Sequence, residues 1–223
     1  MTTGRPFDAV IFDMDGVLVD SEPLHFESTA RVLADLGVRF TAEENDRFVG
    51  WTDAAMFDAL VGRHRLRVPA RDLVARKIAF MLELVHERLP TMAGVPDVPR
   101  RLAATGYRLA VASSAAPALI RAVVDALELS ALFVALVSSE EVPRGKPAPD
   151  VFLEAARRLA VPAARCLVVE DSRNGLLAAK AAGMACVAIA CATTRHHDFS
   201  EADWRLGSLT ELLAVLLTRR GGP

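Results

Sequence analysis

Short continuous runs of hydrophobic residues alternate along this chain with longer segments in which hydrophobic residues recur every three or four positions. The short runs predict strands that are buried on both faces, as in a parallel sheet covered by helices. The longer segments predict amphipathic helices. The predicted strands are residues 9–12, 108–112, 132–137, 166–170, 185–190 and, near the end, 204–206, and the predicted helices among them are residues 117–129, 149–160, 172–183 and 209–217.

Strands that alternate with helices predict an α/β fold, a doubly wound parallel sheet. Residues 22–89 break the alternation, because they contain several helical patterns and no convincing strand. A crossover between parallel strands needs only about a dozen residues, so this stretch is too long for a simple connection. We therefore expect a Rossmann-like core of residues 1–20 and 91–223 and an inserted, all-helical cap domain of residues 21–90.

The insertion leaves the predicted sheet directly after its first strand. Ligands of open α/β sheets bind beyond the carboxyl ends of the strands, so we expect the helical domain to cover that edge, exclude water and control access. Within it, hydrophobic residues recur at helical spacing at Ile78, Leu82, Val85 and Leu89. We expect these four to form the core face of one helix.

The composition is that of a folded protein. Of 223 residues, 52% are hydrophobic and 24% charged, and the formal net charge is −2. No long Lys/Arg run indicates a nucleic-acid or anionic-membrane surface. The first hydrophobic run stops at Asp13, too early for a signal peptide, and no stretch reaches the about 20 residues of a membrane span. We expect a cytoplasmic monomer or homodimer with no nucleic-acid or membrane partner.

Two groups of potential ligands are not expected to take part in chemistry. Cys166, Cys186 and Cys191 lie in hydrophobic, strand-like contexts without CxxC spacing, and we expect buried, reduced thiols. His196 and His197 lie in a polar loop with no acidic partner at ligand spacing. We expect a surface loop there rather than a metal site.

Polar residues follow four of the predicted strands. Because the carboxyl ends of parallel strands lie at one edge of the sheet, we expect these residues to converge. Carboxylates held close together raise each other's pKa unless a cation neutralises them, and carboxylate oxygens suit Mg²⁺. The pattern favours Mg²⁺-dependent phosphoryl transfer, in which a carboxylate attacks phosphorus and a lysine neutralises the transferring group. The residues concerned are Asp13, Asp15, Ser113, Ser114, Lys146, Glu170 and Asp171.

Four segments carry a resemblance to a known family. FDMDGVLVDSEPLH, ASS, GKPAPD and VVEDS, in this order and spacing, resemble the four motifs of the haloacid dehalogenase-like (HAD) hydrolase superfamily. More narrowly, they resemble the branch with a helical cap after the first motif, which includes β-phosphoglucomutase and many sugar-phosphate phosphatases. The resemblance covers essentially the whole chain, and four ordered motifs with the insertion in the expected place are far more specific than any single one.

The resemblance implies catalytic roles for four residues. Asp13 would be the nucleophile, and Asp15 would protonate the leaving oxygen and then activate water. Ser113 would hydrogen-bond the transferring phosphoryl group, and Lys146 would bridge that group and Asp13. Dehalogenases of the superfamily lack an acid two positions after the nucleophile, so Asp15 favours phosphate over halide chemistry.

The resemblance also implies a metal site for Mg²⁺. Its ligands would be the carboxylates of Asp13 and Asp171 and the backbone carbonyl of Asp15. Glu170 would be an inner-shell or outer-shell ligand.

The match to β-phosphoglucomutase is weaker in the cap. His25 and Gly50 match its hinge histidine and a cap glycine, but Asp53 stands where its cap arginine holds the distal phosphate of the substrate. A mutase must hold a bisphosphate by both ends, and an acid at that position would repel one end. This favours a phosphatase, unless nearby Arg47 or Arg63 substitutes for the arginine. The Ser-Lys pair that follows the second motif of the mutase is likewise replaced, by Ala115 and Ala116.

We therefore predict a Mg²⁺-dependent phosphatase that hydrolyses a small phosphorylated metabolite, a sugar phosphate in particular, through a phospho-Asp13 intermediate. One alternative is a phosphosugar mutase, which would need a bisphosphate activator. Another is a non-catalytic regulator with the same fold, which would not bind Mg²⁺. The residues expected to bind the substrate are His25, Gly50, Trp51, Thr52, Asp53 and Ser114.

Overall fold

The computed structural model of the chain describes residues 5–48 and 51–217. The chain divides into two compact units, one of residues 1–20 and 90–223 and the other of residues 21–89. We call them the core unit and the cap unit.

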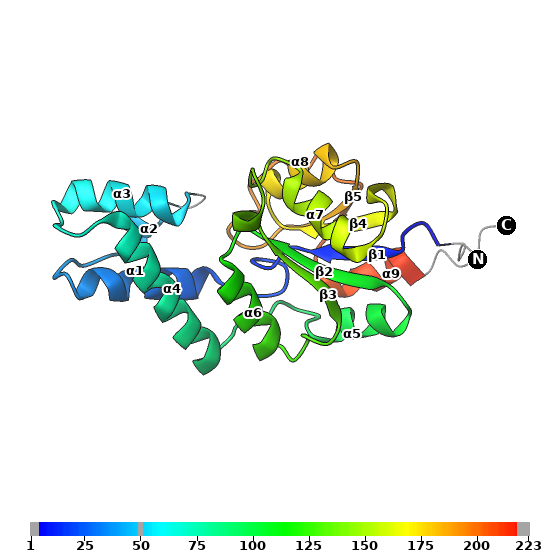
Figure 1. Ribbon diagram of the computed structural model, residues 1–223, viewed down its shortest axis with the longest axis horizontal. Coiled ribbons are helices and arrows are strands. Elements are labelled where there is room, and N and C mark those ends of the chain that lie inside the picture. The colour runs from blue at the N-terminus through cyan, green and yellow to red at the C-terminus, as the bar shows by residue number, and fades with distance from the viewer. Residues whose placement is uncertain (1–4, 49–50, 218–223) are drawn as a thin grey trace. The chain divides into compact units, whose positions relative to one another are not determined.

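The core unit contains a six-stranded sheet in the order β3-β2-β1-β4-β5-β6, and every neighbouring pair is parallel (Figure 1). The predicted α/β fold class is confirmed. Because β1 lies between β2 and β4, the chain order reverses beside β1, which is where ligands bind in sheets of this kind. The strands are β1 (Ala9–Phe12), β2 (Arg108–Ser113), β3 (Phe133–Ser138), β4 (Cys166–Glu170), β5 (Ala185–Ile189) and β6 (Trp204–Leu206).

Helices cover both faces of this sheet (Figure 1). On one face lie α7 (Asp150–Leu159) and α8 (Arg173–Ala181), and on the other lie α5 (Asp97–Ala104), α6 (Pro117–Ala126) and α9 (Leu212–Leu217). Three short 3₁₀ turns, Ser139–Glu141, Ala163–Arg165 and Leu209–Glu211, complete the unit. Helix α5 was not predicted from the sequence.

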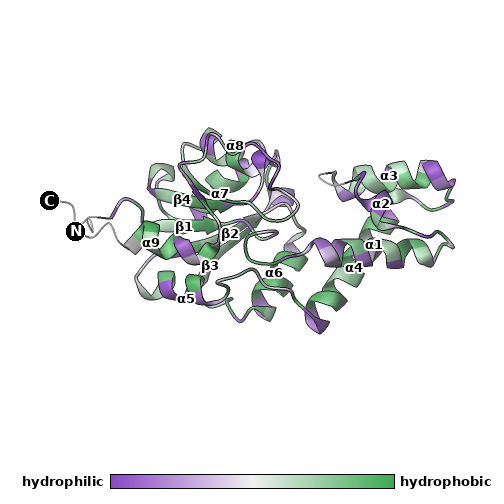
Figure 2. Ribbon diagram, turned by 180° about the vertical axis from the view of Figure 1, so that it is seen from behind, coloured by the Kyte–Doolittle hydropathy of each residue, from purple (hydrophilic) through white to green (hydrophobic). Residues whose placement is uncertain are grey.

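The interior beneath α7 and α8 shows why the strands are hydrophobic throughout. Ile11 of β1 and Val168 of β4 are fully buried, and they belong to the same hydrophobic cluster as Phe152 of α7 and Leu176 of α8. The alternate strand residues face the opposite helix layer, so both faces of each central strand are buried. In Figure 2 the strands are mostly in the hydrophobic colour, and the hydrophilic colour is found mainly on helices and loops.

The cap unit consists of α1 (Glu22–Ala34), α2 (Ala42–Asn45), α3 (Asp53–His64) and α4 (Ala70–Glu87). Its hydrophobic core is formed by Val32, Leu33, Phe40, Phe48, Met56, Phe57, Leu60 and Leu73. No helix in the described part of the chain is long and apolar enough to cross a membrane.

The buried face of α4 is rotated from the predicted one. Its buried residues are Leu73, Lys77, Met81, Leu84 and Val85, whereas Ile78 and Leu82 are only half-buried and Leu89 lies beyond the end of the helix. The unexpected member is Lys77, whose ammonium group forms an ion pair with Asp53 of α3. A buried lysine is stable only with such a partner, so this pair fixes which side of α4 faces inward.

Candidate active site

The side chain of Lys146 joins the ends of the three central strands. Its Nζ atom donates hydrogen bonds to Asp13 Oδ1 at 2.6 Å and to Glu170 Oε1 at 2.6 Å. A third, to the carbonyl oxygen of Ala112, measures 3.2 Å. Asp13 follows β1, Ala112 lies in β2 and Glu170 ends β4. The structure therefore brings together residues from three of the four predicted clusters around one ammonium group.

Burial makes these charges interact strongly. Burial alone would lower the pKa of Lys146, but the carboxylates of Asp13 and Glu170 outweigh it and raise that pKa, so the lysine stays charged. The pKa of Asp13 is raised to about 7, chiefly by burial, with Glu170 and Asp15 adding repulsion against the opposing effect of Lys146. Without a further positive charge, this carboxyl group is only partly ionised at neutral pH.

Three carboxyl groups at this edge form a candidate metal site. Asp13, Glu170 and Asp171 are all buried, and each places an oxygen within 4.8 Å of the other two. The pKa of Asp171 is raised to about 10 by burial and by the charges of Glu170 and Asp13. Carboxylate oxygens are the ligands that hard divalent cations prefer, and a cation would offset this repulsion. The donor set therefore fits a divalent cation.

The position of Glu170 depends on the first turn of α8. Its Oε2 atom accepts hydrogen bonds from the backbone N–H groups of Asp171 and Ser172, at 2.9 and 2.8 Å, and from Ser172 Oγ at 2.9 Å. A Cβ atom at Gly175 would overlap the Glu170 carboxylate. Ser172 also caps the helix, because its Oγ accepts from the N–H of Gly175 at 3.1 Å. Ser172 thus holds the Glu170 carboxylate at the candidate metal site through hydrogen bonds, and Gly175 leaves the space that this carboxylate occupies.

Ser113, the last residue of β2, also meets the segment that follows β1. Ser113 is fully buried, and its Oγ donates to Asp15 Oδ2 at 3.5 Å and accepts from the N–H of Ala115 at 3.0 Å. Ser114 is exposed. Ser113 is therefore fixed on both sides beside the candidate acid, Asp15.

Cys191 is a site residue that sequence reasoning missed. Its Sγ atom donates to Asp171 Oδ2 at 3.1 Å, and the thiol is half-buried, so the expectation of three buried cysteines is wrong for this one. Hydrophobic context suggested burial, as found for Cys166 and Cys186. The signal that could have found the contact is position, because Cys191 follows β5 and its loop lies at the same sheet edge.

The histidine pair lies in the same loop as Cys191. The rings of His196 and His197 are 4.7 Å apart, and His197 Nδ1 accepts a hydrogen bond from the N–H of Arg173 at 3.3 Å. Neither belongs to the group of metal-type ligands found among the described residues. The histidine contact instead ties the loop to the start of α8.

The cap residues that were expected to bind substrate have local structural contacts. Thr52 caps α3, because its Oγ1 accepts from the N–H of Ala55 at 3.2 Å. Trp51 is 55% exposed and packs edge-on against Phe48. His25 lies half-buried in α1, and Gly50 lies outside the described residues. Asp53 is the partner of Lys77. Substrate binding by these residues stays a prediction.

Sequence comparison decides the family. The model of the haloacid dehalogenase-like hydrolases matches residues 7–183. This chain belongs to that family. The HAD-like hydrolase is 36% identical over 217 residues to hexitol phosphatase B of Escherichia coli K12, covering 96% of this chain and 98% of the relative. It is 31% identical over 177 residues to the phosphorylated carbohydrates phosphatase of Thermotoga maritima, covering 79% of this chain and 82% of the relative.

Solved structures agree with the family. The crystal structure of CbbY from Rhodobacter sphaeroides in complex with phosphate superposes with a TM-score of 0.85 and 32% identity, covering 94% of this chain and 99% of the other. The same CbbY has been solved, as a mutant, in complex with xylulose-(1,5)bisphosphate. The resemblance stated from the motifs is confirmed, and this HAD-like hydrolase is a homologue of phosphatases.

Proposed function

We propose that this HAD-like hydrolase is a Mg²⁺-dependent phosphatase that hydrolyses a sugar phosphate or a phosphorylated sugar alcohol through a phospho-Asp13 intermediate. The observation that carries the proposal is the Lys146 ammonium group, which lies 2.6 Å from both Asp13 Oδ1 and Glu170 Oε1. A charged lysine at the nucleophile is suited to a dianionic phosphoryl group. The substrate class is supported by the relatives, a hexitol phosphatase and a phosphorylated carbohydrates phosphatase.

In the first half of the proposed reaction, the Asp13 carboxylate attacks phosphorus and the bond from phosphorus to the sugar oxygen breaks. Lys146 orients the carboxylate through Oδ1 and neutralises charge on the phosphoryl oxygens. Asp15 donates a proton to the leaving sugar oxygen, and Ser113, which reaches Asp15 Oδ2, orients this acid.

In the second half, Asp15 acts as the base. It removes a proton from the water that attacks phospho-Asp13, which releases phosphate and regenerates the free carboxylate.

Asp13, Glu170 and Asp171 are the residues that would hold Mg²⁺. When bound, the ion supplies positive charge that stabilises the oxygens of the transferring group. The raised pKa values of Asp13 and Asp171, about 7 and about 10, support this assignment, because both carboxyl groups need a cation to be fully ionised near neutral pH.

The charges of the cap unit favour a phosphatase over a mutase. Asp53 stands where β-phosphoglucomutase has its phosphate-holding arginine, and it forms an ion pair with Lys77. The charges of the two residues neutralise each other, so no unpaired cation lies at this position. Arg63 is held by Glu44 at 2.8 Å and lies over the ring of Phe48. Both observations count against Lys77 and Arg63 as holders of a second phosphate group, because each already has an acidic partner.

The test is phosphate release from a panel of hexitol phosphates, aldose phosphates, β-glucose 1-phosphate, phosphoglycolate and nucleotides, with Mg²⁺ and with EDTA. We expect Mg²⁺-dependent hydrolysis of a sugar or sugar-alcohol phosphate and no turnover by Asp13→Asn. Isomerisation of β-glucose 1-phosphate with a bisphosphate activator and little phosphate release would make it a mutase. No turnover together with no Mg²⁺ binding would favour the regulator. A changed substrate ranking in Trp51→Ala would support a role for the cap.

A further inference from the structure

One oxygen of Asp171 is held by two side chains of the loop that follows β5. Asp171 Oδ2 accepts hydrogen bonds from Cys191 Sγ at 3.1 Å and from Thr194 Oγ1 at 3.3 Å. These contacts belong to Asp171 alone among the three carboxylates of the candidate metal site. Glu170 is instead held by Ser172 and backbone N–H groups, and Asp13 by Lys146.

The two donors are themselves fixed in place. The N–H of Cys191 donates to Thr194 Oγ1 at 3.1 Å, and the N–H groups of Thr194 and Arg195 donate to the carbonyl oxygen of Cys191 at 3.3 and 3.0 Å. The thiol also lies 3.1 Å from Thr193 Oγ1. The turn therefore presents both donors to Asp171 in a defined geometry.

Gly16 lies close to the same oxygen. This glycine has φ +75°, and a Cβ atom there would overlap the Asp171 carboxyl group. The carboxyl group thus accepts from two donors and also lies close to the backbone of Gly16. Fixing Oδ2 in this way also fixes the direction of Oδ1, the oxygen that these donors leave available.

We propose that Cys191 and Thr194 are positioning residues that hold Asp171 for the divalent cation, and that covalent modification of Cys191 weakens cation binding. This inference rests on the proposed function for its biological meaning, but it concerns cation affinity. Partners that orient a metal ligand typically change metal affinity by about 10-fold to 100-fold. A group attached to Sγ both removes the donor and adds bulk beside Oδ2.

The arrangement makes the modification selective. Cys166 and Cys186 are fully buried, and burial raises the pKa of both thiols, whereas Cys191 is half-buried. Iodoacetamide would form a bond from Sγ of Cys191 to carbon, with loss of iodide and of the thiol proton. The two buried thiols then serve as internal controls in the same molecule.

The experiment measures the dissociation constant for Mg²⁺ by titration calorimetry on the full chain, without substrate. Cys191→Ala and Thr194→Val should each raise it about tenfold, and Cys191→Ser and Thr194→Ser, which keep a donor, should restore it to within about twofold of the wild type. Alkylated wild type should behave as Cys191→Ala, and Cys191→Ser treated with iodoacetamide should not change. Unfolding midpoints measured without Mg²⁺ identify any variant that has lost its fold.

Unchanged affinity in Cys191→Ala and in alkylated wild type would overturn the inference. So would a wild-type chain that binds no divalent cation. A chain that binds Mg²⁺ but hydrolyses no member of the substrate panel would contradict the proposed function alone, since the affinities of the variants still test the role of Cys191 and Thr194.

Discussion

The ammonium group of Lys146 lies 2.6 Å from Asp13 Oδ1, although the two residues are 133 positions apart in the sequence. Both side chains are more than nine-tenths buried, and the same ammonium group contacts Glu170. One cation therefore neutralises part of the charge of two buried carboxyl groups, and it also determines where the proposed nucleophile points.

Replacing Lys146 with Met should affect both activity and stability. Leaving buried carboxylates without their partner costs about 3–5 kcal/mol of stability when no proton or cation compensates. We expect a loss of more than about 100-fold in kcat/KM and a lower urea midpoint at pH 8, with part of the stability restored at pH 5, where Asp13, whose pKa is raised to about 7, can take up a proton. Near-normal turnover by Lys146→Met would contradict the role given to this residue.

Replacing Asp15 with Asn tests its role as the acid that protonates the leaving group. A sugar alkoxide is a poor leaving group and needs this proton, whereas p-nitrophenolate leaves readily without it. We expect Asp15→Asn to lose about 100-fold or more in kcat on the preferred sugar phosphate and much less on p-nitrophenyl phosphate. Equal losses on both substrates would argue for a role in folding or metal binding instead.

Much of the fold follows from local patterns in the sequence. Strands such as Ala9–Phe12 and Cys166–Glu170 were predicted with the bounds that the structure has, because a run that is hydrophobic on both faces fits a covered parallel sheet. Helix α5 was missed because it is short and contains Pro99. Proline is tolerated there, in the first turn, since the N–H groups of that turn have no partner within the helix.

Properties that depend on tertiary packing were harder to predict. The rule that ligands bind at the strand ends grouped Asp13, Lys146 and Glu170, and the structure places them in contact. The same rule did not distinguish the half-buried thiol of Cys191 from a buried one, because its contact with Asp171 depends on how a loop turns. The burial of Lys77 was not predicted for a similar reason. A lysine can be buried on a hydrophobic helix face only if it has an acidic partner, and the sequence alone did not show that Asp53 is this partner.

Replacing Gly175 with Ala should damage the metal site although alanine favours helices. In an exposed helix interior this change stabilises by about 0.5–1 kcal/mol. At Gly175 the added Cβ would overlap the Glu170 carboxylate, so we expect Glu170 to be displaced, Mg²⁺ affinity to fall and turnover to drop.

The matched control for this change is Gly62→Ala in α3, where a Cβ would meet nothing within 4 Å. We expect this variant to be slightly stabilised and to keep its affinity for Mg²⁺. Measuring both variants by calorimetry and thermal unfolding separates the clash at Glu170 from the general effect of removing a glycine. Wild-type affinity in Gly175→Ala would mean that Glu170 is not held as described.

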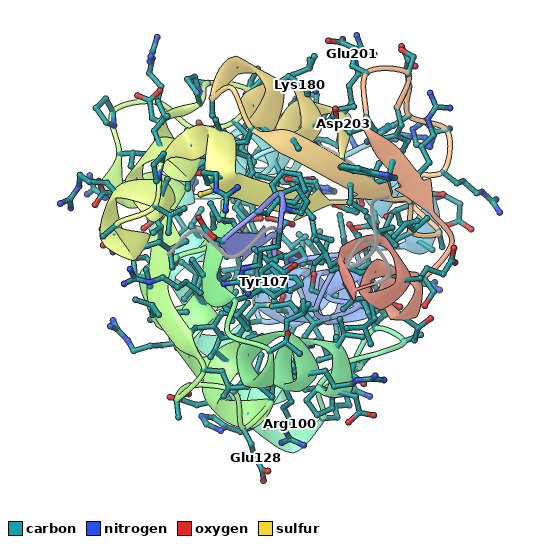
Figure 3. The ribbon with its side chains drawn as sticks, turned by 90° about the vertical axis from the view of Figure 1, so that its right-hand side faces the viewer. Arg100, Tyr107, Glu128, Lys180, Glu201 and Asp203 are labelled. Atoms are coloured by element: carbon teal, nitrogen blue, oxygen red, sulfur yellow. The ribbon has the colours of Figure 1, made fainter. Side chains whose placement is uncertain are left out.

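Acid should weaken the contact between α8 and the loop before β6. Lys180 and Asp203 lie side by side in Figure 3, and Asp203 Oδ2 accepts from Lys180 Nζ at 2.9 Å and from the N–H of Cys186 at 2.8 Å. Burial opposes ionisation of Asp203, but these two donors outweigh it and lower its pKa below the usual 3.8. Since the folded state binds the proton less tightly than the unfolded state, the contribution of this contact to stability is present above about pH 5 and is lost as the pH falls through 3.8 and below.

Asp203→Asn should therefore lower the free energy of unfolding at pH 7 by up to about 1 kcal/mol, a small effect because the pair is partly exposed to solvent. The difference in free energy of unfolding from the wild type should shrink towards pH 3. Urea unfolding across this range measures it, with Glu201→Gln in the same loop as the control. A difference that stays constant with pH would show that Asp203 stabilises the fold by means other than its charge.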